Sequence, residues 1–181
     1  MIRSVLTALA MLTLGTGLAG AQVPQPYIGM QDRPIKALSD QQVSDLKSGR
    51  GMGLALAAEL NGYPGPLHLL ELADQLAMSP AQRASIRELF EAMKAEAVQL
   101  GERLIAQETE LDRQLAGRTV TADSLRSTTV AIGATQAELR YTHLKYHLLA
   151  LAIVTSGQMQ RYLELRGYAG GDQAGHHRLH R

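Results

Sequence analysis

The sequence contains two pairs of closely spaced residues whose side chains are of the types that bind transition metals in proteins. His143 and His147 lie four residues apart, and His68 and Glu71 lie three apart. Residues three or four positions apart share one face of a helix, so each pair can direct two ligand groups at one ion. The alternative for the histidine pair is structural: His143 would be a hydrogen-bonded core residue, and His147 would lie at the rim of the core.

The composition excludes several other kinds of site. The chain has 181 residues, 18 of them basic and 17 acidic, with no cysteine, no tryptophan and one phenylalanine. Without cysteine it cannot form a disulfide, a zinc–thiolate site, an iron–sulfur cluster or a thiol nucleophile. The formal net charge of +1 and the absence of a basic run do not favour nucleic-acid binding. A core with so few aromatic residues must be aliphatic, which favours helices over sheets.

Enzymatic activity is not expected. A carboxylate-bridged di-iron bundle needs two Glu-x-x-His motifs on facing helices. The residues three places before the histidines of the folded domain are Gly65, Arg140 and Leu144. The sequence also has no clear Ser/His/Asp arrangement and no phosphate-binding loop.

The first 21 residues have the pattern of a secretory signal peptide. Arg3 precedes an apolar run over 5–18, and the small residues of 19–21 match a cleavage site. The alternative is an uncleaved membrane anchor, but the run is shorter than the roughly 20 residues that span a bilayer. We therefore expect a secreted chain that begins near Gln22.

Two segments near the ends of the chain lack a sustained apolar period. Residues 22–50 contain three prolines and many polar side chains, which predicts a flexible linker. Residues 169–181 are predicted to form a disordered tail that carries His176, His177 and His180. As an alternative, these three histidines could collect the same metal ion weakly, because a flexible arm loses entropy on chelation.

Residues 51–168 are predicted to form one helical domain, since their apolar side chains recur with a period of 3.6. The predicted helices cover 52–60, 67–77, 79–117, 121–153 and 155–167. Ser79, Thr121 and Thr155 are the expected N-caps of the last three. The fold class is therefore all-α, a long antiparallel helical hairpin with short flanking helices.

The two long helices must pair across a short turn, which sets their register. Residues whose numbers add up to about 238–243 are then expected to lie opposite each other. Gln107 and Gln136 interrupt the two apolar stripes and come close in this register. We expect them to hydrogen-bond and fix the register, unless either side chain points to water.

The same register is expected to bring the two ligand pairs together. The expected neighbours are 86–91 for residues 68–71, 91–96 for His147, and 95–100 for His143. All four side chains would meet at the open end of the hairpin, with Glu91 or Glu96 nearby. Two or three neutral imidazoles and a carboxylate suit zinc, nickel, cobalt or copper. The methionines Met78, Met93 and Met159 are expected to fill the core, although a copper site could recruit one.

Two of the capped helix starts are similar to each other. Residues 78–82 read Met-Ser-Pro-Ala-Gln, and residues 154–158 read Val-Thr-Ser-Gly-Gln. Together they resemble the paired LTxxQ motif of the Spy/CpxP family of periplasmic helical proteins, with Met78 and Val154 in place of Leu and Ser79 in place of Thr. The metal-binding ZraP and the metal sensor CnrX belong to this family. The resemblance covers roughly 52–168, together with the signal peptide and the size of the hairpin.

The resemblance implies a periplasmic all-α hairpin that forms a cradle-shaped homodimer. One branch of the family holds unfolded periplasmic proteins without ATP, and the other binds divalent metals and reports or buffers them. In the sensor branch, His and carboxylate side chains of the early helix and the late long helix hold the ion. The residues here that could match are His68, Glu71, His143 and His147.

We therefore expect a periplasmic metal-binding protein of the heavy-metal sensor or resistance type. Its expected cofactor is a divalent transition metal, and its expected partners are a second copy and a membrane-bound signalling protein. The alternative is an ATP-independent chaperone of the envelope stress response that acts on unfolded periplasmic proteins. The near-neutral long helices attract such clients weakly, so the sequence ranks this alternative second.

Overall fold

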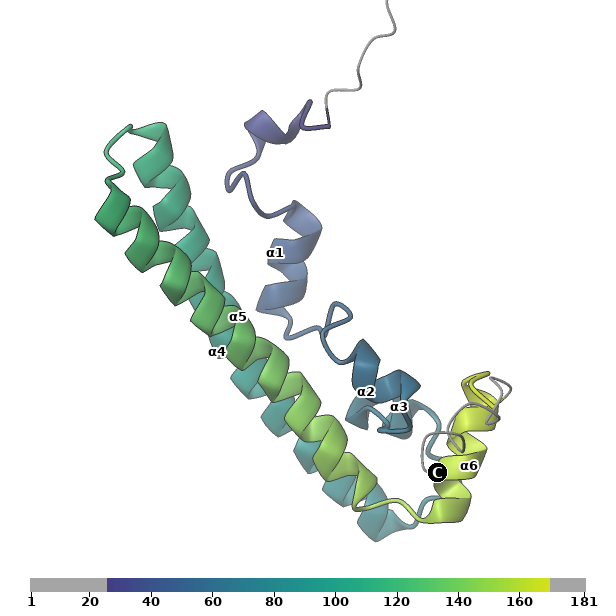
Figure 1. Cartoon of the computed structure of the whole chain (residues 1–181). Coiled ribbons are helices and arrows are strands. Elements are labelled where there is room, and N and C mark those ends of the chain that lie inside the picture. Colours follow the sequence, from purple (N-terminus) through teal and green to yellow (C-terminus); the bar gives the residue numbers. More distant parts are fainter. Residues whose placement is uncertain (1–25, 170–181) are drawn as a thin grey trace, which may run out of the picture.

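The computed structural model of this chain describes residues 26–169, and within them it contains helices and no strand. The elements are η1 (Met30–Asp32), α1 (Asp40–Lys47), α2 (Leu56–Leu60), α3 (Pro66–Glu71), α4 (Pro80–Ala116), α5 (Ala122–Leu151) and α6 (Ser156–Leu165). The predicted all-α fold is confirmed, with α4 and α5 as the long antiparallel hairpin (Figure 1). The predicted signal peptide over 1–21 and the histidines of the tail lie outside the described residues. From residue 26 to residue 169, no helix combines the length and the apolar character needed to cross a membrane.

The three predicted N-caps are confirmed. Ser79, Thr121 and Thr155 each accept a hydrogen bond from the backbone N–H three residues later. In return, the side chain of that third residue accepts from the N–H of the cap. Each box satisfies two backbone donors that helix geometry leaves unpaired.

The predicted register of the hairpin is confirmed at its open half. Glu96 of α4 accepts hydrogen bonds from Lys145 Nζ and Tyr146 Oη of α5, both at 2.8 Å. The predicted pairing of Gln107 with Gln136 is wrong. Gln136 is exposed, and Thr135 takes the buried position between Ile132 and Leu139. Thr135 and Gln136 are neighbours in the sequence of α5. An apolar stripe on a helix advances in steps of three or four residues, and the sequence alone does not say whether the step from Ile132 is three, to Thr135, or four, to Gln136.

The predicted flexible linker over 22–50 is wrong for residues 40–47, which form α1. Ser39 and Gln42 form a capping box at its start, and Leu46 is only 2% exposed. Gly101 of α4 makes this docking possible, because a Cβ at that position would lie 2.5 Å from the carbonyl oxygen of Leu46. The helix is polar apart from two residues, so its sequence has no apolar period long enough to reveal it.

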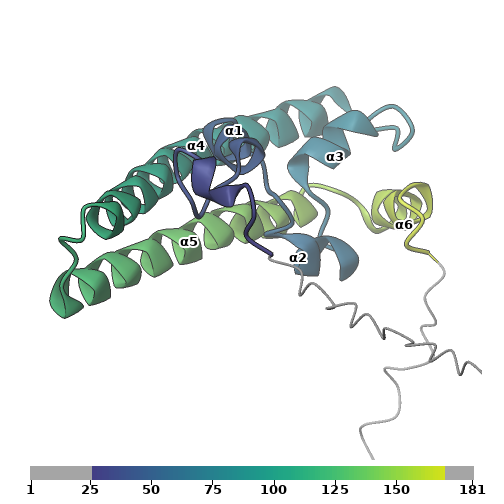
Figure 2. The ribbon, with the colours of Figure 1, turned by 90° about the horizontal axis from the view of Figure 1, so that it is seen from above.

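The short helices cover one side of the hairpin. Helices α1 and α3 pack on α4, and α2 packs on α5 (Figures 1 and 2). Helix α2 begins later than predicted, at Leu56, because left-handed turns at Met52 and Gly53 precede it. Helix α3 ends at Glu71, and hydrogen-bonded turns continue the chain from there to the Ser79 cap.

The two LTxxQ-like segments lie against each other. Gln82 Nε2 donates to Gln158 Oε1 at 2.8 Å, and Gln158 Nε2 donates to Gln82 Oε1 at 3.1 Å. The same two amide groups also donate to the carbonyl oxygens of Ile153 and Leu76. This exchange joins the start of α6 to the start of α4 and so positions α6 beside α2 and α3 (Figure 1).

Candidate metal site

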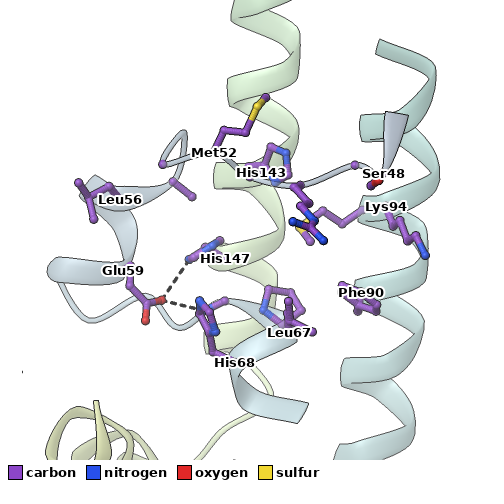
Figure 3. A pocket seen from close by; sticks show the side chains of 18 of the residues that line it. Ser48, Met52, Leu56, Glu59, Leu67, His68, Phe90, Lys94, His143 and His147 are labelled. Carbon is purple, nitrogen blue, oxygen red and sulfur yellow. Dashed lines mark hydrogen bonds and ion pairs between the residues drawn. The ribbon is translucent and has the colours of Figure 1, made fainter. Parts of the chain in front are cut away.

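A cavity of about 710 Å³ lies between the short helices and the open half of the hairpin. Its lining includes His68, His143 and His147 together with Glu59, Met52, Met93, Phe90 and Leu67 (Figure 3). The three predicted histidine ligands therefore reach one cavity from two elements, α3 and α5.

One ring nitrogen of His147, Nδ1, has a hydrogen-bond partner, and the other, Nε2, is available to bind a metal ion. Its Nδ1 lies 2.8 Å from the carbonyl oxygen of Tyr63. A carbonyl oxygen only accepts hydrogen bonds, so Nδ1 carries the proton and Nε2 of the neutral ring keeps its lone pair. This arrangement is typical of metal-ligating histidines, whose other ring nitrogen donates to a carbonyl or a carboxylate.

His68 has the same arrangement with a different acceptor. Its Nδ1 lies 3.1 Å from Glu71 Oε2, so an ionised Glu71 fixes the proton on Nδ1 and leaves Nε2 for a ligand. Glu71 itself is exposed and does not line the cavity. In this conformation it therefore orients His68 rather than facing the other histidines.

Gly65 lies close to the imidazole rings of both His68 and His147. A Cβ at position 65 would lie 3.1 Å from His147 Nε2 and 3.4 Å from His68 Cδ2. Because this glycine has no side chain, the two imidazoles can approach the same point. Any larger residue at position 65 would occupy the space in front of His147 Nε2.

His143 is the most deeply buried of the three histidines, with 2% of its surface exposed. Its Nε2 is buried and has no hydrogen-bond partner among the described residues. Burial lowers the pKa of His143 below its usual value of 6.5, and a positive charge on the nearby His147 would lower this pKa further. His143 is therefore neutral at pH 7, which is the state that a metal ligand requires.

Glu59 is a buried acid in this region that the sequence did not single out. One of its oxygens, Oε1, accepts from Tyr162 Oη at 2.5 Å and from Arg166 Nε at 3.2 Å. The other, Oε2, accepts from the Gly65 N–H at 3.2 Å and lies 4.0 Å from His147 Nδ1 (Figure 3). Glu59 thus links α2 to α6 and faces the protonated nitrogen of His147. The sequence signal was a single acid in the apolar segment 54–60.

Among residues 26–169, no free carboxylate lies beside the three histidines. Glu96 binds Lys145 and Tyr146, and Glu91 is exposed and does not line the cavity. Over residues 26–169, no three His, Cys, Asp or Glu side chains are grouped closely enough to hold an ion. An ion bound here would therefore need side-chain movement, which His68 can supply because it is half-exposed and held only by an exposed glutamate.

Comparison with known proteins gives no family for this chain. No family model, no curated protein and no solved structure matches it. The resemblance to the Spy/CpxP family therefore depends on the two LTxxQ-like segments, and membership of that family is part of the proposal below.

Proposed function

We propose that this chain is a periplasmic metal-binding protein of the heavy-metal sensor or resistance type, related to the Spy/CpxP family. A transition-metal ion, with divalent zinc, nickel, cobalt and copper as the candidates, would be held by His68, His143 and His147. The observation that carries this proposal is the approach of His68 and His147 over Gly65, each with its Nδ1 proton bound to an acceptor.

The burial of His143 supports the same proposal. A buried nitrogen without a hydrogen-bond partner costs about 1–3 kcal/mol, so its retention calls for an explanation. A metal ion in the cavity would satisfy Nε2 of His143 and recover that free energy. The lowered pKa of His143 also reduces the competition between proton and metal at pH 7.

The reciprocal glutamine pair supports the proposed relationship to the family. Gln82 and Gln158 are the last residues of the two LTxxQ-like segments, and they bond to each other as well as to their own caps. The paired motif thus has a structural role here, which is to join the start of α6 to the hairpin. The implied partners, a second copy of the chain and a membrane-bound signalling protein, are part of the same proposal.

The metal proposal is tested by titrating the secreted form of the chain with zinc, nickel, cobalt and copper by calorimetry. We expect one tight ion per chain and a loss of affinity of about 100-fold or more in His147→Ala, because one of three ligands is removed. Glu71→Gln is expected to weaken binding by about 10-fold, since it loosens only the orientation of His68. Circular dichroism verifies that each variant is folded.

The matched control replaces the three tail histidines, His176, His177 and His180, by alanine in one chain. This control is expected to leave the tight site unchanged. Absence of binding in the wild-type chain, or binding that both His143→Ala and His147→Ala leave unaffected, contradicts the proposal.

A second candidate function, an ATP-independent chaperone, is favoured by one surface. Helix α5 carries apolar residues at alternating steps of four and three on the face that points away from α4. Val130, Tyr141 and Leu148 of this stripe are 64%, 59% and 60% exposed, and Ala134 and Ala137 lie between them. Exposed apolar patches of this kind bind other chains, either a second copy or unfolded clients.

The chaperone candidate predicts that the chain suppresses aggregation of an unfolded model client at a stoichiometric ratio. The double variant Val130→Glu and Leu148→Glu is expected to lose most of this suppression while its metal affinity stays unchanged, because the stripe faces away from the cavity. Light scattering measures the aggregation, with Gln136→Glu, an exposed substitution off the stripe, as the control. A wild-type chain that gives no suppression, with or without metal, excludes this candidate.

A further inference from the structure

We propose that Glu59 couples the metal site to the C-terminal end of α6, because a metal ion at His147 and the guanidinium of Arg166 compete for its carboxylate. Metal binding then loosens the contact between Glu59 and Arg166, and release of Arg166 raises the metal affinity. This inference rests on the proposed function, that the cavity holds a divalent ion. It goes beyond that function in naming the residue that tunes the affinity and the part of the chain that responds.

Glu59 provides the negative charge that a divalent ion in this cavity needs. Among the described residues that line the cavity it is the one acid, and only 6% of its surface is exposed. Its Oε2 lies 4.0 Å from His147 Nδ1 (Figure 3). The Nδ1 proton itself is donated to the carbonyl oxygen of Tyr63, so Glu59 acts on the imidazole through its charge. A carboxylate behind a metal-bound histidine stabilises the positive charge that the ion induces on the ring.

The same carboxylate already holds a cation. Arg166, the residue after α6, donates from Nε to Glu59 Oε1 at 3.2 Å, and it also lines the cavity. Two cations beside one buried carboxylate repel each other, and each weakens the interaction of the other with that carboxylate. The side chain of Arg166 is 29% exposed, so it can exchange Glu59 for water. The ion and Arg166 are therefore competitors for Glu59.

Helix α6 is anchored at its start by a contact that this competition does not affect. The neutral amides of Gln82 and Gln158 bond to each other there, and neither residue lines the cavity. Tyr162 in the middle of α6 is fully buried. The part that responds to the ion is therefore the chain from Arg166 onward. By thermodynamic linkage, the factor by which the ion weakens the docking of this end equals the factor by which undocking strengthens ion binding.

The test uses two variants that break the same ion pair in the full secreted chain. Zinc affinity is measured by calorimetry, and stability by urea unfolding. Glu59→Gln is expected to weaken zinc binding by about 10-fold, since the carboxylate charge is lost. Arg166→Gln is expected to strengthen zinc binding by about 5-fold, since the competitor is lost. A merely structural role of the ion pair predicts a change in the same direction for both variants, because both lose the same contact.

Two matched controls break other ion pairs. Glu96 resembles Glu59 in binding a tyrosine hydroxyl and a cation, but it does not line the cavity. Arg161 lies on α6, pairs with Glu164 and does not line the cavity. Glu96→Gln and Arg161→Gln are each expected to leave zinc affinity unchanged.

The double variant of Glu59→Gln and Arg166→Gln separates competition from direct repulsion. In the Glu59→Gln chain, Arg166→Gln is expected to lose most of its effect on zinc affinity, because the shared carboxylate charge is absent. An effect of equal size in both chains would show that Arg166 only repels the ion, and it would contradict the coupling.

A measurement on the wild-type chain needs no variant to fold. The Nε–H signal of Arg166 is followed by nitrogen-15 NMR with and without zinc. The hydrogen bond to a buried carboxylate slows exchange of this proton with water, and zinc is expected to accelerate the exchange several-fold. The corresponding signal of Arg161 is expected to stay unchanged.

The outcomes distinguish this inference from the proposed function. If zinc binds but leaves the Arg166 signal unchanged, the coupling is wrong and the metal site stands. The same conclusion follows if Glu59→Gln and Arg166→Gln shift zinc affinity in the same direction. If no ion binds, the proposed function and this inference are both wrong.

Discussion

Gly101→Ala is expected to destabilise the protein by about 2–3 kcal/mol, although alanine normally stabilises a helix interior. The new Cβ would lie 2.5 Å from the carbonyl oxygen and 2.9 Å from the carbonyl carbon of Leu46, atoms of the backbone that cannot rotate away. Helix α1 must then move off α4, and Leu46 loses its burial, which is worth about 1.5–3 kcal/mol. Urea-induced unfolding followed by circular dichroism measures the change.

Gly133→Ala is the matched control for this substitution. Gly133 also lies inside a long helix, but a Cβ there meets nothing within 4 Å. Alanine at this position is expected to stabilise the protein by about 0.5–1 kcal/mol through helix propensity alone. Trypsin is expected to cleave after Lys47 faster in Gly101→Ala than in the control. If Gly101→Ala is as stable as Gly133→Ala, α1 does not dock on α4 in solution.

Glu59→Ala is expected to cost about 2–4 kcal/mol of unfolding free energy. The substitution leaves the buried Tyr162 hydroxyl, the Gly65 N–H and the Arg166 guanidinium without their common acceptor. Removal of one partner from a buried charged network is among the most destabilising single changes. Arg166 is partly exposed and can turn to water, which places the effect below the upper limit for such networks. Chemical unfolding of the metal-free chain measures it.

Glu71→Ala is the matched control on the neighbouring short helix. Glu71 is exposed and bonds only to His68, so its removal is expected to cost less than about 1 kcal/mol. Glu59→Gln keeps one accepting oxygen and is expected to fall between the two. Equal stability of Glu59→Ala and Glu71→Ala would show that the network with α6 does not contribute to folding.

The helices of this protein could be predicted because their signals are local. A capping box consists of residues three positions apart, so Ser79–Gln82 and Thr155–Gln158 identify helix starts without knowledge of the fold. The short turn after Gly117 requires two long helices, each with one apolar stripe, to pair antiparallel, and the length of that turn sets their register. The contact of Glu96 with Tyr146 confirms a pairing derived from numbering alone.

The expectation that His68, His143 and His147 lie near one another came from the same local information. Once the register was set, the four-residue spacing of His143 and His147 placed both on one face, and α3 was expected to fold back along the start of α4. The structure agrees that His68, His143 and His147 line one cavity. The expected carboxylate neighbour did not follow, because the rotation of a side chain toward Lys145 or toward a histidine depends on its three-dimensional neighbours.

Sequence alone thus determined the all-α class, the capped starts of α4, α5 and α6, the hairpin register and the spacing of the histidines. Only the tertiary structure decided that α1 docks through Leu46 on Gly101, that Thr135 rather than Gln136 is buried, and that Glu59 joins α2 to α6. It alone decided which imidazole nitrogens are free, since Tyr63 and Glu71 take the other ones. The physical reason is range: helix caps and periodicity act within one or two turns, whereas these contacts join residues whose approach depends on the packing of the whole domain.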